Sequence, residues 1–535
     1  MVMKNHLYSL VETACQKFPR SIAFYEKGQA YTFSEFEEMC KRKVQWLSGK
    51  GVKEGDFIAL WLVNGVEWLS WYFSLSRLGC TVVPINTRYG KKEIEDMMVK
   101  SSPKALIMQK EFRSKNFLNL LSSVERHAVE SIDVIYCAGL NFSDSDELNE
   151  MVFFSDDSLS ECCGESEVSS YAPVPNGSLT SILFSTSGTT SGPKLVMQSQ
   201  SNLVTHANNC AKFYGLNKHG MTLLAVLPFC GAFGLNAVLA AFSGGAATVI
   251  IDALDGKEAA LLMKKYKVTH LFGSDDMYRK IIDSCDEEKP FPDARFFGFG
   301  AFNSSFHEYA VNAWARGIPL FGLYGSSEVM AIFSAQDDSM TLKERIKGGG
   351  KPTAGDEAKI RIRDIATSNI LPAGESGEIE IQSPTNFTGY LDNDEATRNA
   401  LTEDGFFKTG DLGYIREDGS LVYESRMGDA IRLGGFLVNP SEIEDVIKKV
   451  PNVLDVCVVA IQYQEANVAI AFVKESQESE GLENQVIDAC KLNLAPFKVP
   501  KYVFKVSEFP ATSGPNGLKI QRGSLRNMAE AAVGN

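Results

Sequence analysis

The sequence is poor in histidine, and its cysteines are scattered. Its 535 residues contain six histidines and eleven cysteines, and no two cysteines form a C-x-x-C pair. An odd, dispersed set of thiols suits a reducing compartment better than a disulfide framework, and the histidines show no metal-binding spacing. The first residues also lack the apolar segment of a secretory signal. We therefore expect a cytoplasmic protein whose histidines bind no metal.

Basic residues are in the minority. Lysine and arginine total 53 against 67 aspartates and glutamates, which gives a net charge of −14 at pH 7. A protein that binds nucleic acid needs a large basic surface, so a nucleic-acid partner is not expected. A local basic pocket for a nucleotide is compatible with this charge, because net charge does not describe a single pocket.

Charged residues are missing altogether from residues 221–251. A run of this length could cross a membrane. Proline and glycine interrupt it, for example at Pro228 and Gly234, and residues 246–251 have the composition of a strand. We predict a buried strand, loop, helix and strand, and no transmembrane segment. An uncharged interior of this kind suits the wall of an apolar substrate pocket.

Short apolar runs alternate with helical patterns through much of the chain, which is typical of βαβ units. The length predicts about two to four domains. We expect an α/β protein with a large N-terminal domain of doubly wound βα sheets, a small β element beginning near Asp364, and a small mobile α+β domain at the C-terminus. Residues 143–170, rich in Ser, Asp and Glu, are expected to form a solvated loop or linker. Strands are expected at 57–62, 81–84, 105–108, 132–135, 223–227 and 248–251.

The first chemical motif is the segment 185–194, which is rich in hydroxyls and glycine and ends in Lys194. Glycine lets the backbone approach a ligand closely, exposed N–H groups in a turn bind anions, and lysine suits phosphate. Pro193 separates Gly192 from Lys194, so the segment is not a Walker A loop. Taken alone, it is compatible with a polyphosphate site or with a polar surface loop.

Two later segments carry residues suited to a nucleotide. Within 320–329, Tyr324 could stack on a purine, and Glu328 is a hard oxygen ligand suited to Mg²⁺. Asp411 could accept hydrogen bonds from ribose hydroxyls, and Arg426 could pair with Asp411 or reach a phosphate. Each segment alone is also compatible with a strand end followed by a solvated turn.

A late lysine, Lys519, follows a loop of glycine, proline and asparagine. A lysine on such a loop can be delivered to a distant site, although an exposed lysine on a tail gives the same pattern.

The order of these motifs is more specific than any one of them. A hydroxyl, glycine and lysine loop, then Tyr-Gly-x-Ser-Glu, Thr-Gly-Asp, Arg-x-x-Asp and a late Gly-x-Lys, resembles the adenylate-forming superfamily in its acyl-CoA synthetase branch. The resemblance covers the chain from about Leu7 to its end. It implies that ATP, with Mg²⁺, converts a carboxylic acid to acyl-AMP and pyrophosphate, and that coenzyme A then displaces AMP. Catalysis of this kind is mostly charge stabilisation and positioning.

The resemblance also implies two domains. Residues 1–426 would form the adenylation core with the ATP and acyl pockets, and residues 427–535 a mobile lid that carries the catalytic lysine. The hinge is expected at Gly428, because glycine accepts a wide range of backbone angles. Rotation there would withdraw Lys519 and bring Gly434 and Gly435 to the thiol tunnel.

Residue by residue, the resemblance assigns catalysis to Lys519, Glu328 and Ser327. Lys519 would bridge the α-phosphate and the attacking carboxylate, and Glu328 would hold Mg²⁺. Tyr324 would stack on adenine, and Asp411 would bind the ribose. The residues expected to bind the nucleotide are Thr186, Ser187, Gly188, Thr189, Thr190, Lys194, Gly300, Ala301, Phe302, Tyr324, Gly325, Ser326, Asp411 and Arg426.

The acyl pocket is expected near 228–234 and 348–350. Residues 221–251 offer no carboxylate for an α-ammonium group, so an amino-acid substrate is disfavoured, and the apolar lining suggests a fatty or aryl acid. The expected pocket residues are Phe229, Cys230, Gly231, Phe233, Gly348 and Gly349.

Three residues depart from the family pattern. Ser191 stands where glycine is usual, Gly231 stands where many relatives have an aromatic residue or histidine, and Leu518 separates Gly517 from Lys519. Two alternatives stay open. A ligase that loads an acyl carrier protein would use the same adenylating residues, and a non-catalytic protein that binds nucleotide and acyl groups would share the fold.

Overall fold

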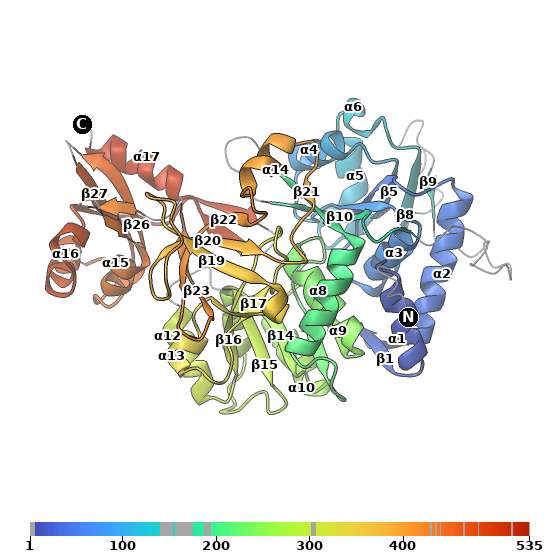
Figure 1. Cartoon of the computed structure of the whole chain (residues 1–535), viewed down its shortest axis with the longest axis horizontal. Helices are drawn as coiled ribbons and strands as arrows, with labels where there is room; N and C mark the ends of the chain where they lie inside the picture. Colours follow the sequence, from blue (N-terminus) through green and yellow to red (C-terminus); the bar gives the residue numbers. More distant parts are fainter. Residues whose placement is uncertain are drawn as a thin grey trace.

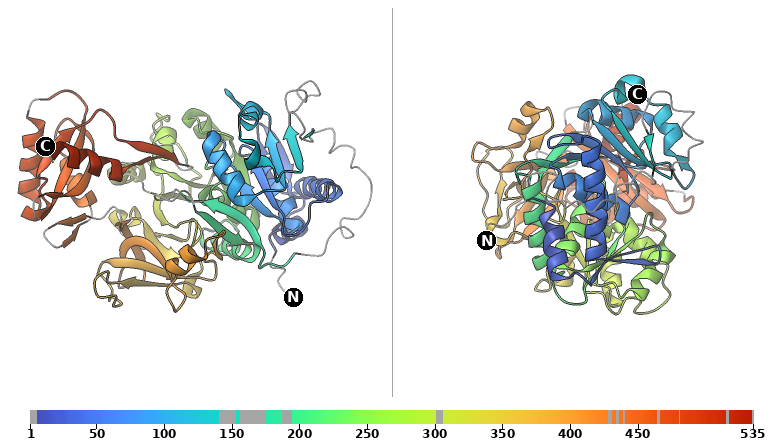
Figure 2. Two further views of the ribbon diagram at one scale, coloured as in Figure 1. Left: turned by 90° about the horizontal axis from the view of Figure 1, so that it is seen from above. Right: turned by 90° about the vertical axis from the view of Figure 1, so that its right-hand side faces the viewer.

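The computed structural model describes residues 6–139, 153–155, 175–186, 194–300, 306–427, 431–433, 436–438, 440–463, 466–479, 481–514 and 517–533. Within these ranges, two large sheets form the body of the protein, and a smaller α+β unit lies beyond one end of the body (Figure 1). Figure 2 shows the same unit extending from the body in a second view. The expected α/β class is confirmed.

The first sheet has thirteen strands among the described residues, and one part of it is parallel. Helices connect the parallel strands because each connection must bring the chain back to the end of the sheet where the next strand begins. In spatial order the strands of this part are β16 (Leu320–Tyr324), β15 (Phe296–Gly300), β14 (His270–Ser274), β12 (Thr222–Ala225), β13 (Ala247–Ile250) and β1 (Ile22–Glu26), with β2 (Gln29–Thr32) antiparallel at the edge. Their helices are α9 (Ala232–Gly244), α10 (Gly256–Lys265), α11 (Asp275–Ile282) and α12 (Phe306–Ala315).

The expected small β element is present. It continues the first sheet beyond β16 as an antiparallel extension. The extension consists of β17 (Ser334–Ala335), β18 (Gly349–Pro352), β23 (Leu421–Arg426), β22 (Phe407–Ile415), β20 (Gly377–Gln382) and β19 (Lys359–Arg363).

The second sheet has eight strands in the part of the chain that the structure describes. They are β21 (Gly389–Tyr390), β11 (Leu195–Ser199), β10 (Thr180–Ser185), β4 (Thr81–Pro84), β3 (Phe57–Trp61), β5 (Ala105–Gln109), β8 (Val134–Ala138) and β9 (Phe153–Phe154). The accompanying helices are α1 (Ser9–Lys17), α2 (Phe33–Gly49), α3 (Val66–Arg77), α4 (Lys91–Ser101) and α5 (Phe117–Ser122). Strand β9 lies within the expected linker, so that prediction was wrong for these two residues; the other residues of 143–170, apart from Ser155, lie outside the described ranges.

Helices α8 (Gln200–Phe213) and α9 join the two sheets. Helix α8 contacts β11 of the second sheet, α9 contacts β12 and β13 of the first, and the two helices pack against each other. Nearly every residue of α9 is buried, which explains why the run 221–251 carries no charge. The run folds as strand, loop, helix and strand, as predicted. No helix of the described residues is long and apolar enough to cross a membrane.

The C-terminal unit has its own apolar interior. Its two buried clusters contain only residues from Ile431 onward, whereas the clusters of the body contain only earlier residues. The unit consists of β24 (Ile431–Leu433), β25 (Phe436–Val438), α15 (Pro440–Ile447), β26 (Val453–Tyr463), β27 (Ala466–Glu475), α16 (Leu482–Asn493), β28 (Tyr502–Lys505), β29 (Ala511–Gly514), β30 (Gly517–Ile520) and α17 (Arg522–Val533). The boundary between residues 426 and 427 stays a prediction.

Two histidines are buried inside the body and hold backbone carbonyls. The Nε2 atom of His206 donates to the carbonyl of Ala331 (2.9 Å), and that of His270 donates to the carbonyl of Tyr214 (2.8 Å). Burial lowers the pKa of each histidine from 6.5 to about 4. Both side chains are therefore neutral in the native protein at neutral pH.

We expect these histidines to make the fold sensitive to acid. Between pH 6.5 and about 4 the unfolded chain binds protons that the native chain does not, so stability is lost as the pH falls through this window. Each histidine should cost about 2 kcal/mol of stability at pH 5. Urea unfolding at pH 7 and pH 5 checks this: the midpoint should drop less in His206→Gln or His270→Gln than in the wild type. An equal drop would contradict the assignment.

Candidate functional site

The hydroxyl-rich segment is the connection between two antiparallel strands, β10 and β11. Ser185 pairs with Leu195, and the Thr186 N–H donates to the carbonyl of Lys194 (3.0 Å). This hydrogen bond fixes Thr186 and Lys194 at the two ends of the turn. Lys194 therefore lies at the mouth of the predicted phosphate loop.

Tyr390 links this lysine to the predicted metal ligand. The Nζ atom of Lys194 lies 4.8 Å from the centre of the Tyr390 ring, and the Tyr390 hydroxyl donates to Oε1 of Glu328 (3.0 Å). The pairing of β21 with β11 places Tyr390 opposite Val196, next to the lysine. Burial, and then the charge of Glu328, raises the pKa of Tyr390 far above its usual range, so the hydroxyl stays a donor.

The turn that carries Glu328 is fixed by backbone hydrogen bonds. The Phe387 N–H donates to the carbonyl of Glu328 (2.7 Å), and the buried Gln198 amide donates to the carbonyl of Ser327 (2.8 Å). The Glu328 N–H donates to the hydroxyl of Ser326 (3.2 Å). The turn after β16 is thus attached to β11, the same strand that follows the phosphate loop.

The glycine of this turn has a packing role. A side chain on Gly325 would come within 2.7 Å of the carbonyl oxygen of Met330. Met330 (φ 68°) and Ile332 (φ 59°) both adopt left-handed backbone angles, which are costly for a β-branched residue. The Tyr214 hydroxyl donates to the carbonyl of Ile332 (2.9 Å), and His206 holds the carbonyl in between. His206 of helix α8 and Tyr214, which follows this helix, therefore hold the loop after Glu328 in a strained conformation.

Asp411 is the centre of a second polar cluster. The Tyr324 hydroxyl donates to Oδ2 of Asp411 (2.7 Å), and Nε of Arg426 lies 3.2 Å from Oδ1. Asp411 and Arg426 are direct neighbours across β22 and β23, which explains how residues fifteen apart meet. Asp411 is the main cause of the raised pKa of Arg426, and Glu328 contributes to it. Arg426 is therefore within electrostatic reach of both carboxylates.

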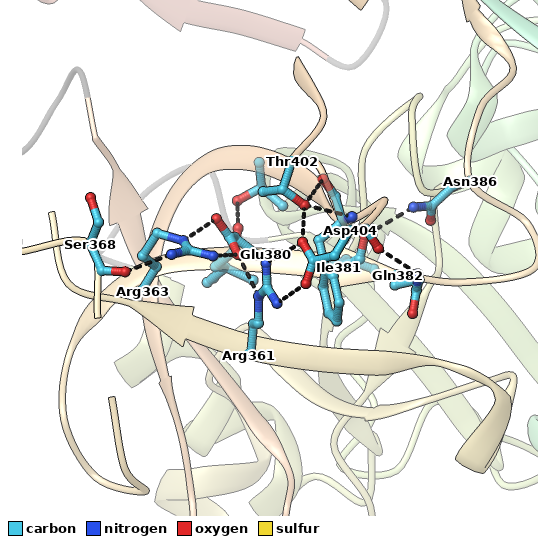
Figure 3. A network of polar contacts seen from close by, with 12 residues as sticks. Arg361, Arg363, Ser368, Glu380, Ile381, Gln382, Asn386, Thr402 and Asp404 are labelled. Carbon is cyan, nitrogen blue, oxygen red and sulfur yellow. Dashed lines mark hydrogen bonds and ion pairs between the residues drawn. The ribbon is translucent and has the colours of Figure 1, made fainter. Parts of the chain in front are cut away.

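A network of ion pairs holds the strands around β22 (Figure 3). Glu380 on β20 is fully buried. Its carboxylate accepts hydrogen bonds from Nε of Arg361 (2.6 Å) and from Nε of Arg363 (2.6 Å). Arg361 also pairs with Asp404 (2.5 Å) and lies 3.8 Å over the ring of Phe406. These pairs attach β19 and β20 to the turn that begins β22, so they support the strand that carries Asp411.

The predicted acyl-pocket residues lie in two places. Phe229 is fully buried, and its ring packs edge-on against Trp68, so it belongs to the core. Cys230 and Gly231 are half-buried where α9 begins, and burial raises the pKa of Cys230 to about 12. Phe233 is the second residue of α9 and is buried.

The glycines near residue 349 lie between strands. The Tyr423 N–H donates to the carbonyl of Gly348 (2.9 Å), and Gly349 has a φ of 118°. A side chain on Gly349 would come within 2.2 Å of the carbonyl oxygen of Leu421. Strand packing alone accounts for these glycines, and their role in an acyl pocket stays a prediction.

Several predicted residues cannot be placed in the site. Gly300 ends β15, and Lys519 lies on β30, where its backbone pairs with Thr512 but its side chain is outside the described part. The residues that lie outside the described ranges are Ser187, Gly188, Thr189, Thr190, Ala301, Phe302, Gly428, Gly434 and Gly435.

The structure brings Lys194 and Glu328 together through Tyr390, and it brings Tyr324 and Arg426 together through Asp411. Tyr390 and Gln198 complete the arrangement, and sequence reasoning missed both. A tyrosine after glycine and a glutamine in an apolar strand carry no chemical signature of their own. Only the pairing of β21 with β11 and the approach of β16 to β11 explain their positions.

The donor set at Glu328 fits a hard divalent cation. Oε1 accepts the Tyr390 hydroxyl, and Oε2 accepts no hydrogen bond from any described residue. Within the described ranges, no group of three or more His, Cys, Asp or Glu side chains could hold a metal. A cation held by Glu328 would need further ligands, and phosphate and water are the usual ones for Mg²⁺ at phosphate sites.

Comparison with known proteins defines the family. The model of a family described as AMP-binding enzyme matches residues 11–391, and the model of the AMP-binding enzyme C-terminal domain matches residues 442–514. The first match covers more than half of the chain. The chain belongs to the AMP-binding enzyme family, and the predicted membership of the adenylate-forming superfamily is confirmed.

Individual relatives agree with this assignment. The chain is 25% identical to a putative acyl-CoA synthetase, YngI, of Bacillus subtilis over 97% of this chain and 96% of that protein. It is 26% identical to the medium-chain fatty-acid–CoA ligase of Escherichia coli over 96% of this chain and 89% of that protein. These names bear out the expectation of an acid–thiol ligase.

Solved structures share the fold. ATP-bound MatB from Rhodopseudomonas palustris superposes with a TM-score of 0.82 at 22% identity, covering 98% of this chain and 99% of that one. The O-succinylbenzoate coenzyme A synthetase MenE from Bacillus subtilis, in complex with ATP and magnesium ion, gives a TM-score of 0.76 at 22% identity, covering 94% and 96%.

We expect Tyr390 to affect nucleotide binding through its hydroxyl and its ring separately. Tyr390→Phe keeps the ring beside Lys194 but removes the donor to Glu328, and should weaken the binding of ATP with Mg²⁺ about tenfold. Tyr390→Leu removes both contacts and should weaken it further. Calorimetric titration measures the affinity, and Tyr25→Phe on β1 is the control. Wild-type affinity in both Tyr390 variants would exclude this role.

Proposed function

We propose that the protein activates a carboxylic acid with ATP to form acyl-AMP and then transfers the acyl group to coenzyme A. The observation that carries this proposal is the contact chain from Lys194 through Tyr390 to Glu328, within electrostatic reach of the Asp411 and Arg426 pair. A phosphate-binding cation, a cation ligand and a ribose acceptor are the groups that the nucleotide half of this reaction needs.

The first half-reaction forms the acyl-AMP. A carboxylate oxygen of the acid attacks the α-phosphorus of ATP, and the bond from that phosphorus to the bridging oxygen of pyrophosphate breaks. Lys519 would lie between the two negative groups and lower their repulsion, and Thr186 and Lys194 would hold the leaving phosphates. Glu328 would hold Mg²⁺, which neutralises phosphate charge.

The second half-reaction forms the thioester. The thiol of coenzyme A releases its proton to solvent, and its sulfur attacks the acyl carbon. The bond from that carbon to the phosphate oxygen breaks, and AMP leaves with the electron pair of that bond. We propose that residues 427–535 rotate about Gly428 between the two steps, so that Lys519 withdraws and Gly434 and Gly435 face the thiol tunnel. The separate apolar clusters of the C-terminal unit support such a rigid rotation.

We propose a fatty or aryl acid as the substrate. The start of α9 is uncharged and lies beside buried aromatic residues, and an apolar wall favours an apolar acid over an amino acid. Gly231 leaves more space at this point than a larger side chain would. The cytoplasmic location stays a prediction.

The test is pyrophosphate release over a panel of short, medium-chain fatty, aryl and dicarboxylic acids, with and without coenzyme A. We expect release with fatty or aryl acids and an acyl-CoA product when coenzyme A is present. Release without a coenzyme A thioester would favour loading of an acyl carrier protein. No release with any acid would favour a non-catalytic protein that binds nucleotide and acyl groups.

Lys519→Ala should abolish acid-dependent pyrophosphate release while ATP still binds, because the lysine acts on the attacking carboxylate. Lys491→Ala, an exposed position on α16, is the control and should behave as the wild type. Pyrophosphate release at the wild-type rate by Lys519→Ala would show that another cation performs this role.

A further inference from the structure

The strands that carry Lys519 form an isolated ribbon. Strands β29 and β30 pair only with each other among the described residues, with Lys519 opposite Thr512. The red ribbon at the C-terminal end reaches from its unit toward the body in Figure 2. A single two-stranded hairpin is marginally stable in water, so its position depends on what holds its base.

Arg522 holds that base. It begins α17 only three residues after Lys519, its Nη1 atom donates to the carbonyl of Val458 (2.6 Å), and Nη2 lies 2.8 Å from Oε1 of Glu444. The Val458 N–H donates to the same oxygen of Glu444 (2.8 Å). The guanidinium fork thus joins α17 to β26 and α15 at one point, and the side chain of Glu444 is only 4% exposed.

Two further contacts fix where the ribbon leaves this point. The Gln521 N–H donates to the carbonyl of Pro510 (2.7 Å), which closes the base of the hairpin. Ile520 and Phe509 pack on a small cluster that includes Leu525. This apolar cluster attaches α17 to the unit independently of Arg522. The ion pair of Arg522 therefore determines the direction in which the hairpin leaves the unit more than it determines the attachment of α17.

We propose that Arg522, with Glu444, is a positioning residue for Lys519 in the adenylation step. This inference rests on the proposed function, because the lysine acts only there. The fork fixes the base of the ribbon, and a shift there is carried to the lysine amine at the far end of a long side chain. Misplacement by about 1 Å can cost about a hundredfold in rate. The thioester step does not use the lysine and should not depend on the pair.

Three variants separate positioning from folding. Arg522→Lys keeps the charge beside Glu444 but loses the fork. Arg522→Gln removes the charge. Arg522→Gln alone leaves the buried Glu444 carboxylate without its cation, and this can prevent folding. Arg522→Gln combined with Glu444→Gln removes both charges, so we expect the double variant to fold even if the single variant does not. Lys491→Gln, which breaks the exposed pair with Asp488 in the same unit, is the control.

Three measurements on the full chain decide the proposal. Pyrophosphate release is followed with the acid that the panel selects, and acyl-CoA formation is followed from supplied acyl-AMP of the same acid. We expect pyrophosphate release to fall about tenfold to a hundredfold in Arg522→Gln and in the double variant, and less in Arg522→Lys, while acyl-CoA formation keeps the wild-type rate. Hydrogen exchange should become faster in residues 511–520 and stay unchanged in β26 and β27.

Equal loss of both half-reactions would overturn the proposal, because it would mean that Arg522 only stabilises the unit. Wild-type pyrophosphate release, or unchanged exchange in residues 511–520, would overturn it as well. Failure of the proposed function is a different outcome: the wild type would then release no pyrophosphate with any acid, and the exchange experiment would still decide whether Arg522 anchors the ribbon.

Discussion

The ring and hydroxyl of Tyr390 lie between an ammonium group and a carboxylate that come from different sheets. Lys194 precedes β11 of the second sheet, and Glu328 follows β16 of the first. Tyr390 reaches both because the chain leaves the antiparallel extension of the first sheet and adds β21 to the edge of the second. The arrangement of the site therefore depends on this crossing, which joins the two sheets at the place where the charges meet.

A second constraint acts on the loop after β16. Gly325 has no room for a side chain, and Ile332 adopts a left-handed backbone angle that costs stability. Hydrogen bonds from His206 and Tyr214, on and just after α8, hold the carbonyls of this loop. Because α8 follows β11 directly, one continuous segment supplies Lys194, Gln198 and the groups that hold the loop. The segment that follows the phosphate loop thus positions Glu328.

The sequence could single out Lys194, Glu328 and Asp411, because a lysine after a hydroxyl-rich loop and carboxylates in turns suggest a chemistry that can be read locally; their roles stay predictions. It could also predict the strand and helix pattern, since β12, α9 and β13 follow from the uncharged run and its glycines. It could not predict Tyr390 or Gln198, because their roles come from strand pairing over long separations. The attachment of the small β element to the large sheet could not be predicted for the same reason: β17 and β18, which connect them, are short and carry no periodic signal.

The Asp411 cluster and the hairpin that carries Lys519 have independent supports. The Asp411 cluster depends on the register of β22 and β23 and on the buried Glu380, whereas the ribbon with Lys519 depends on Arg522 and Glu444 in another hydrophobic unit. No described side chain belongs to both supports. Under the proposed mechanism, nucleotide binding and the delivery of the lysine are therefore separable properties. A substitution in the Asp411 support would change nucleotide binding, and a substitution in the Arg522 support would change delivery of the lysine, because the two supports lie in separate hydrophobic units.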